Sequence, residues 1–142
     1  MSKILVSYFS ITGTTKRKAE ILANEVGGDL FEIKAKEPYK EEDLEWVNGA
    51  ARSRKEYYDD NAKPEILGIP YNIEEYDTIY LCFPIWWNIS PKVIRTFIES
   101  IDNKKKKFVT FCTSGGAELE PATEYLKSIY PKLKIENGRR LL

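Results

Sequence analysis

Ser10-Ile11-Thr12-Gly13-Thr14-Thr15 is the most informative stretch of this 142-residue chain. The apolar run 3–9 precedes it, and the helical pattern 14–26 follows it directly. A buried strand, a short hydroxyl-rich turn and a helix in immediate succession are typical of a βα unit. The first N–H groups of a helix have no internal partner, and the helix dipole favours an anion there. The stretch therefore predicts a phosphate site of hydroxyls and amides, where Gly13 lets the backbone approach the ligand closely.

The same stretch has a simpler interpretation. Serine and threonine are preferred N-cap residues, so one or two of these hydroxyls could merely cap the helix. Four hydroxyls in six residues are more than a cap requires. The P-loop is excluded, because it needs two glycines in a fixed frame and a lysine before the final Ser or Thr. The glycine fingerprint of dinucleotide-binding folds is excluded for the same reason.

Composition limits the classes of protein that this chain can represent. It is 42% hydrophobic and 31% charged, which predicts a single globular domain over residues 1–142. The 22 basic residues balance 22 acidic ones, so neither nucleic acid nor a membrane surface is an expected partner. The chain has no histidine, which excludes imidazole-based triads and Cys/His metal sites, and we assign no catalytic side chain and no metal ligand.

The two cysteines, Cys82 and Cys112, lie in apolar strand-like runs and are expected to be buried small hydrophobes. The N-terminus lacks the pattern of a signal peptide, and no apolar run is long enough to span a bilayer. These features predict a cytoplasmic protein.

Hydrophobic runs and helical patterns alternate along the rest of the chain. Further strand-like runs are residues 30–33, 78–83, 108–112 and 134–142, and helical patterns cover residues 91–101 and 118–130. Ser90 is the expected N-cap of the first of these helices, with Pro91 in its first turn. Residues 38–75 are less regular, and a polar helix over 41–58 is expected there. The alternation predicts an α/β domain with a parallel sheet, whose ligands bind beyond the carboxyl ends of the strands.

Two more loops at strand ends carry unusual residues. Pro84-Ile85-Trp86-Trp87-Asn88-Ile89-Ser90 holds two adjacent tryptophans, which predict a stacking surface for a flat ring, although one of them could fill the core. Asn88 tolerates left-handed backbone, so this turn is able to change conformation. Thr113-Ser114-Gly115-Gly116 offers backbone N–H groups to the polar edge of a ring, or is a plain turn in which Ser114 caps a helix. Together the three loops predict a phosphate end, an aromatic wall and a polar edge.

On these segments the chain resembles flavodoxins, in particular a short branch with a Pro-Ile-Trp-Trp loop. The matching segments are residues 6–15, 76–87 and 111–116, in order and at similar spacing. The resemblance implies a three-layer, flavodoxin-like α/β fold. Its five-stranded parallel sheet would have the order 2-1-3-4-5 and helices on both faces, and the family's C-terminal helix is expected to be missing.

The resemblance also implies FMN as the cofactor. The residues that would hold its phosphate are Ser10, Thr12, Gly13, Thr14 and Thr15. The residues that would wrap one side of the isoalloxazine are Pro84, Ile85, Trp86, Trp87 and Asn88, and its other edge would be lined by Thr113, Ser114, Gly115 and Gly116. A stacked tryptophan and few nearby cations predict a lowered flavin potential.

Three functions fit these observations. The first is electron transfer with a redox partner protein. The second is a small reductase that uses NAD(P)H to reduce quinones, nitro compounds or similar acceptors. The tryptophan loop and the aromatic residues Tyr39, Trp46, Tyr57 and Tyr58 could form its substrate wall, although packing in the core and on the surface is the favoured interpretation of these four. The third is a binding domain without flavin, against which the intact loops argue. Unlike most flavodoxin carriers the chain is not acidic, so long-range steering of partners is expected to be weak. Without a C-terminal helix, a second subunit in a homodimer or the segment 38–75 is expected to cover an open sheet face.

Overall fold

A computed structural model describes residues 3–44, 51–86, 89–114 and 116–142. One five-stranded sheet runs through it in the order β2-β1-β3-β4-β5, and every neighbouring pair of strands is parallel. The strands are β1 Ile4–Tyr8, β2 Asp29–Glu32, β3 Thr78–Pro84, β4 Lys107–Thr113 and β5 Lys134–Arg140. The expected fold class and strand order are thereby confirmed.

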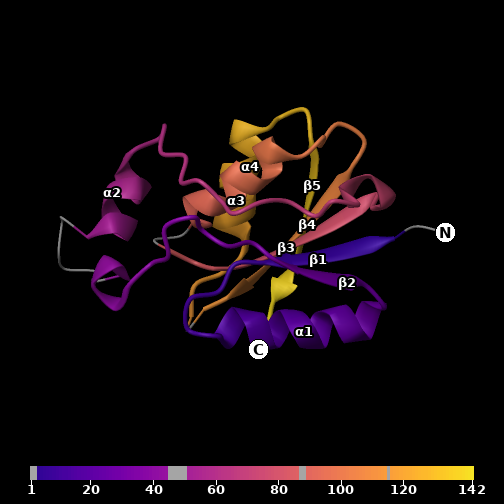
Figure 1. Cartoon of the computed structure of the whole chain (residues 1–142), viewed down its shortest axis with the longest axis horizontal. Coiled ribbons are helices and arrows are strands. Elements are labelled where there is room, and N and C mark those ends of the chain that lie inside the picture. The colour runs from indigo at the N-terminus through magenta and orange to yellow at the C-terminus, as the bar shows by residue number, and fades with distance from the viewer. Residues whose placement is uncertain (1–2, 45–50, 87–88, 115) are drawn as a thin grey trace.

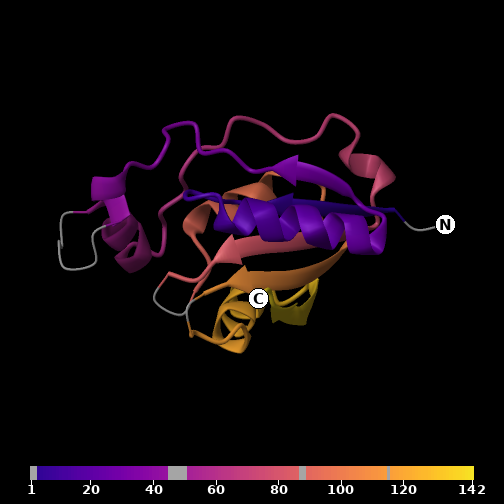
Figure 2. The same cartoon turned by 90° about the horizontal axis from the view of Figure 1, so that it is seen from below.

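Helices cover both faces of this sheet (Figure 1). The elements between strands are α1 Thr14–Val26, η1 Glu41–Leu44, α2 Arg52–Tyr58, η2 Ile73–Glu75, α3 Lys92–Ser100 and α4 Glu120–Ile129, of which η1 and η2 are 3₁₀ turns. Helix α1 lies across one face, as Figure 2 shows from that side, while α3 and α4 cover the other. None of the helices in the described residues is long and apolar enough to cross a membrane.

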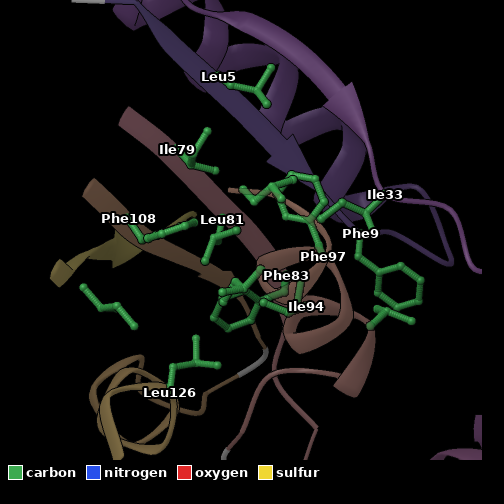
Figure 3. Close-up of a cluster of buried hydrophobic side chains, with 14 of the residues drawn as sticks. Leu5, Phe9, Ile33, Ile79, Leu81, Phe83, Ile94, Phe97, Phe108 and Leu126 are labelled. Atoms are coloured by element: carbon green, nitrogen blue, oxygen red, sulfur yellow. The ribbon is translucent and has the colours of Figure 1, made fainter. Parts of the chain in front are cut away.

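The core consists of two layers, one on each side of the sheet. Because successive side chains of a strand point to opposite faces, β3 contributes to both layers. Ile79, Leu81 and Phe83 pack toward α3 and α4, where Phe97 and Leu126 meet them (Figure 3). On the opposite side of β3, Cys82 packs with the apolar stripe of α1. A strand buried on both faces explains the continuous apolar run of the sequence at this point.

Two local expectations are wrong. Pro91, not Ser90, occupies the N-cap position of α3, and no side chain caps this helix. The hydroxyl of Ser90 is buried and has no hydrogen-bond partner among the described residues. The single helix predicted over 41–58 is instead η1 and α2, and residues 45–50 between them lie outside the described part of the chain.

The middle segment packs against α3 and therefore lies on the side of the sheet opposite α1. Lys92 Nζ donates to the carbonyl of Asp59 at 3.2 Å, and Thr96 Oγ1 donates to the carbonyl of Pro64 at 2.8 Å. On the α1 side of the sheet the Arg139 guanidinium reaches over the Phe111 ring, 5.8 Å from its centroid. The expectation that a second subunit or residues 38–75 cover an open sheet face stays a prediction.

Candidate functional site

The turn after β1 leaves the start of α1 open to a ligand. Gly13 occupies the N-cap position with φ +94°, in the left-handed region that favours glycine, and no side chain caps the helix. The Ser10 hydroxyl accepts a hydrogen bond from the Gly13 N–H at 3.1 Å, outside the helix. The first helical bond runs from the Arg17 N–H to the Gly13 carbonyl. The hydroxyls therefore do not serve as an N-cap, and the N–H groups of the first turn can meet an anion.

The threonines of this turn fall into two groups. Thr12 and Thr14 are exposed, with their hydroxyl oxygens 3.4 Å apart. Thr15 is buried, and its hydroxyl lies 2.7 Å from the hydroxyl of Thr113 at the end of β4. The phosphate turn and the third loop, 98 residues apart in the sequence, are therefore joined by one buried hydrogen bond.

The second and third loops share a cavity of about 240 Å³ at the carboxyl edge of the sheet. We call it the slot. Its lining residues are Leu44, Ser53, Pro84, Ile85, Trp86, Thr113 and Ser114. Five of the seven were predicted from the sequence, while Leu44 and Ser53 were missed. Both come from the middle segment, where no hydrophobic period or motif distinguishes them from their neighbours.

Not every predicted ring contact can be placed in the slot. Trp87, Asn88 and Gly115 lie outside the described residues. Gly116 is exposed and lines a different, polar hollow with Arg139 and Arg140. Ser114 is half-buried, and its hydroxyl donates to the carbonyl of Ala117 rather than capping α4, which begins at Glu120.

Trp86 serves both as core and as a wall of the slot. Its ring lies edge-on to Phe9 at 6.0 Å and to Tyr39 at 5.4 Å between centroids. Phe9 and Tyr39 also contact each other edge-on, at 5.6 Å. The backbones of Trp86 and Ile89 exchange two hydrogen bonds, of 2.9 and 3.1 Å. Because three rings and two backbone bonds fix it, Trp86 offers a preformed apolar surface.

A polar cluster holds α2 beside this wall. The Arg52 guanidinium stacks on Tyr39, 3.8 Å from the ring centroid, and forms an ion pair of 3.0 Å with Glu56. The Tyr39 hydroxyl donates to the same Glu56 carboxylate. Burial, and then this carboxylate, raise the pKa of Tyr39 well above its ordinary value, so its hydroxyl remains a donor. The cluster positions Ser53, the next residue after Arg52, at the slot.

A backbone contact also ties Thr113 to the second loop, since its carbonyl accepts the Ile85 N–H at 3.3 Å. All three loops therefore meet at Thr113. The chemistry of the slot lining is that of hydroxyls, amides and apolar groups, without a thiol, an amine or a carboxylate side chain among the described residues. Burial raises the pKa of the Cys112 thiol to about 11 and that of Cys82 further, and neither thiol lines the slot. A phosphate turn joined to a slot for a planar group is suited to a phosphorylated ring cofactor.

Comparison with known protein families shows which family this chain belongs to. The profile of the family described as Flavodoxin matches residues 3–142. The chain belongs to the flavodoxin family. No curated protein matches it. The resemblance that the three loops carry is confirmed at the level of the family, while the roles of the single residues remain predictions.

Solved structures agree with this flavodoxin assignment. A protein of Bacteroides eggerthii DSM 20697, provisionally assigned as a flavoprotein, is 45% identical with a TM-score of 0.97, over 99% of this chain and 89% of that one. A counterpart from Bacteroides uniformis ATCC 8492 is 42% identical with a TM-score of 0.94, over 99% and 90%. A flavoprotein of Lactobacillus acidophilus NCFM, solved in complex with FMN, shares the fold at 22% identity and a TM-score of 0.73, over 99% and 94%. The family and this complex support the expected cofactor, FMN.

Proposed function

We propose that this flavodoxin binds FMN and transfers electrons. The observation that carries the proposal is the buried Thr15–Thr113 hydrogen bond, which unites an uncapped helix start and a tryptophan-walled slot in one site. A helix N-terminus favours a phosphate, and an apolar cavity with few polar groups favours a planar ring. FMN is the flavin that combines the two, since riboflavin lacks the phosphate.

The residues present fit that cofactor. The backbone N–H groups at the start of α1 and the exposed hydroxyls of Thr12 and Thr14 would bind the phosphate without adding positive charge. Pro84, Ile85 and Trp86 would form the apolar wall of the ring site. When bound, FMN supplies the redox chemistry, and the protein supplies position and electrostatics.

Electron transfer accounts best for a slot whose described lining residues include no carboxylate, amine or thiol and no base beside their hydroxyls. The acceptor would be a redox partner protein or a small molecule. The buried free thiols of Cys82 and Cys112 are compatible with a reducing compartment, which supports the cytoplasmic setting that we propose.

The experiment compares the binding of FMN and riboflavin to the apoprotein by quenching of flavin fluorescence. We expect tight binding of FMN and much weaker binding of riboflavin. Thr14→Val should weaken FMN about tenfold, because one hydrogen bond to a charged phosphate is lost, and should leave riboflavin unchanged. Thr78→Val, at the opposite edge of the sheet, is the matched control and should change neither. Equal affinities of the wild type for FMN and riboflavin would refute the phosphate site.

A reductase of quinones or nitro compounds is the second candidate. The balanced charge favours it, since 22 basic and 22 acidic residues give little long-range attraction to a charged partner protein. In addition, Leu44 and Ser53 show that the middle segment contributes to the slot. The FMN-loaded protein should then oxidise NADPH or NADH steadily with a soluble quinone. Turnover no faster than that of free FMN, together with rapid one-electron exchange with a carrier protein, would favour the carrier.

A further inference from the structure

A second, much smaller cavity lies directly behind the tryptophan wall of the slot. Its volume is about 10 Å³, close to the space that one water molecule requires. Its lining residues are Ser53, Glu56, Tyr57, Trp86, Ile89, Ser90, Pro91 and Lys92. Ser53 and Trp86 line the slot as well, so the two cavities are separated by single side chains. We call this cavity the chamber.

Two hydroxyls of the chamber have no partner. Ser53 and Ser90 are 2% and 1% exposed, and neither hydroxyl oxygen has a hydrogen-bond partner among the described residues. Buried hydroxyls in folded proteins nearly always have one, so two of them around one cavity indicate a place for a polar occupant. Neither hydroxyl is fixed by the fold, so both are free to rotate and orient in the electric field of their surroundings.

That field comes from a buried cation. Lys92 is 2% exposed, and its ammonium donates to the carbonyl of Asp59 at 3.2 Å and to the hydroxyl of Tyr125 at 3.0 Å. It forms no ion pair within the described parts of the chain. Arg95 adds a second cation, because it donates to the same Tyr125 hydroxyl at 3.1 Å and to the carbonyl of Asp60 at 2.9 Å.

The one carboxylate of the chamber does not neutralise this charge. Glu56 is paired with Arg52 at 3.0 Å and accepts the Tyr39 hydroxyl, so the Glu56–Arg52 pair contributes no net charge. Within the described residues the Lys92 ammonium is held by neutral groups, namely the Asp59 carbonyl and the hydroxyl and ring of Tyr125, whose centroid lies 5.5 Å away. A buried charge without a counter-ion is costly to the fold. The burial of Lys92 therefore does not stabilise the fold by any ion pair that the structure describes.

We propose that Lys92, through the hydroxyl-lined chamber behind Trp86, makes the slot electropositive and favours the negative charge that a bound flavin gains on reduction. This inference rests on the proposed function, because it requires FMN in the slot. Uptake of two electrons and one proton adds one negative charge to FMN, and a fixed cation on the far side of one ring stabilises that charge. The hydroxyl of Ser53, which lines both cavities, and that of Ser90, which lines the chamber, are the dipoles that would transmit the effect.

The inference reverses one expectation from the sequence. Few cations were expected near the ring, with a lowered potential as the consequence, whereas the fold places Lys92 on the buried side of α3. At an effective dielectric constant near 20, a unit charge separated from the ring by one layer of side chains changes an equilibrium by about one power of ten. Neutralising Lys92 should therefore weaken the binding of reduced FMN about tenfold relative to oxidised FMN. That ratio corresponds to about 30 mV in the midpoint potential of a two-electron couple.

The experiment measures the dissociation constants of oxidised and reduced FMN anaerobically, with dithionite as the reductant, for the wild type, Lys92→Met and Lys92→Arg. Lys106→Met is the matched control. Lys106 is also buried without an ion pair among the described residues and donates to two carbonyls, of Ile73 at 2.9 Å and Tyr76 at 2.5 Å. It precedes β4 and so lies at the edge of the sheet opposite the slot.

We expect the ratio of the two constants to change about tenfold in Lys92→Met and to stay at the wild-type value in Lys92→Arg and Lys106→Met. If Lys92→Met does not fold, Lys92→Gln retains a donor for Asp59 and Tyr125 and should show the same loss. An unchanged ratio in the neutral Lys92 variant, or an equal change in Lys106→Met, overturns this inference and leaves FMN binding intact. Failure of the wild type to bind FMN overturns the proposed function itself, and this inference with it.

Discussion

Replacing Thr113 by valine should destabilise the apoprotein, and replacing Thr15 as well should restore most of the loss. The two hydroxyl oxygens lie 2.7 Å apart, and the residues are 8% and 3% exposed. Valine has the shape of threonine without the hydroxyl. Each single substitution therefore leaves one buried hydroxyl without its partner, whereas the double substitution removes both.

The magnitude follows from that difference. An unsatisfied buried hydroxyl costs about 1–3 kcal/mol, so each single variant should lose about 1.5 kcal/mol of unfolding free energy. The double variant should lose no more than about 1 kcal/mol, because exchanging both partners for apolar groups of the same shape is nearly neutral. The coupling energy of the cycle is then about 2 kcal/mol, within the range found for residues in direct contact.

The assay is urea denaturation of the four apoproteins, followed by FMN titration of each. Thr110 and Thr123 provide a comparison cycle, since their hydroxyl oxygens lie 2.8 Å apart and both residues are fully buried in the fold, away from the slot lining. Each of these hydroxyls also lies within hydrogen-bond distance of a carbonyl, of Glu136 at 3.2 Å and of Leu119 at 3.5 Å, so their coupling in stability should be smaller than that of Thr15 and Thr113. Only the cycle of Thr15 and Thr113 should also lower FMN affinity.

If the loss of unfolding free energy in the double variant equals the sum of the two single losses, the coupling energy is near zero and the predicted dependence of the two hydroxyls on each other is wrong. Equal effects of both cycles on FMN affinity would show that binding follows overall stability and not the bond between the loops.

Three further predictions follow from single contacts. Gly138→Ala should lower the unfolding free energy measured in urea by about 1–3 kcal/mol, because the added Cβ would lie 2.5 Å from a backbone oxygen of β4. Gly116→Ala should be nearly neutral, because the Cβ added there would have no contact within 4 Å among the described residues. Burial raises the pKa of Cys112 from 9 to about 11, so the stability that its neutral thiol contributes is complete below pH 9 and is lost as the pH rises to 11. In Cys112→Ala the unfolding free energy should therefore fall about 2 kcal/mol less between pH 9 and pH 11 than in the wild type, and an equal fall in both proteins would contradict this. Arg52→Ala removes the stacking on Tyr39, so limited proteolysis should cleave residues 38–58 several-fold faster, and an unaltered rate would show that α2 is held by other contacts.

Most of the fold could be predicted from the sequence, because hydrophobic periodicity and helix-ending residues are local signals. The bounds of α1 agree with the expected helix, because its apolar stripe and Gly27, which ends it in a left-handed conformation, are local signals. The start of α3 was assigned to Ser90 because serine commonly caps helices, yet the fold directs its hydroxyl into the chamber. Short-range preference cannot anticipate such a choice, since packing of Trp86 and α2 decides it.

The candidate site also contains residues that the sequence predicted and residues that it did not. Pro84 and Thr113 end β3 and β4, and Ile85 and Ser114 follow them directly. Strand ends of a parallel sheet meet at one edge, so the convergence of these residues was predictable. Ser53 was not, because α2 is a short polar helix without a period of its own. Its place depends on contacts with Tyr39, Glu56 and α3 that form only in the folded chain.

The alternation of strands and helices, the hydroxyl-rich turn 10–15 and the loops after β3 and β4 could be predicted from the residues, since these patterns depend on neighbours along the chain, while the strand order came from the family resemblance. The bond of Thr15 to Thr113, the contribution of the middle segment to the slot and the burial of Lys92 appear only in the folded chain. The physical reason is that hydrogen bonding and the cost of burying a charge depend on which distant groups come together, and no local pattern records those partners.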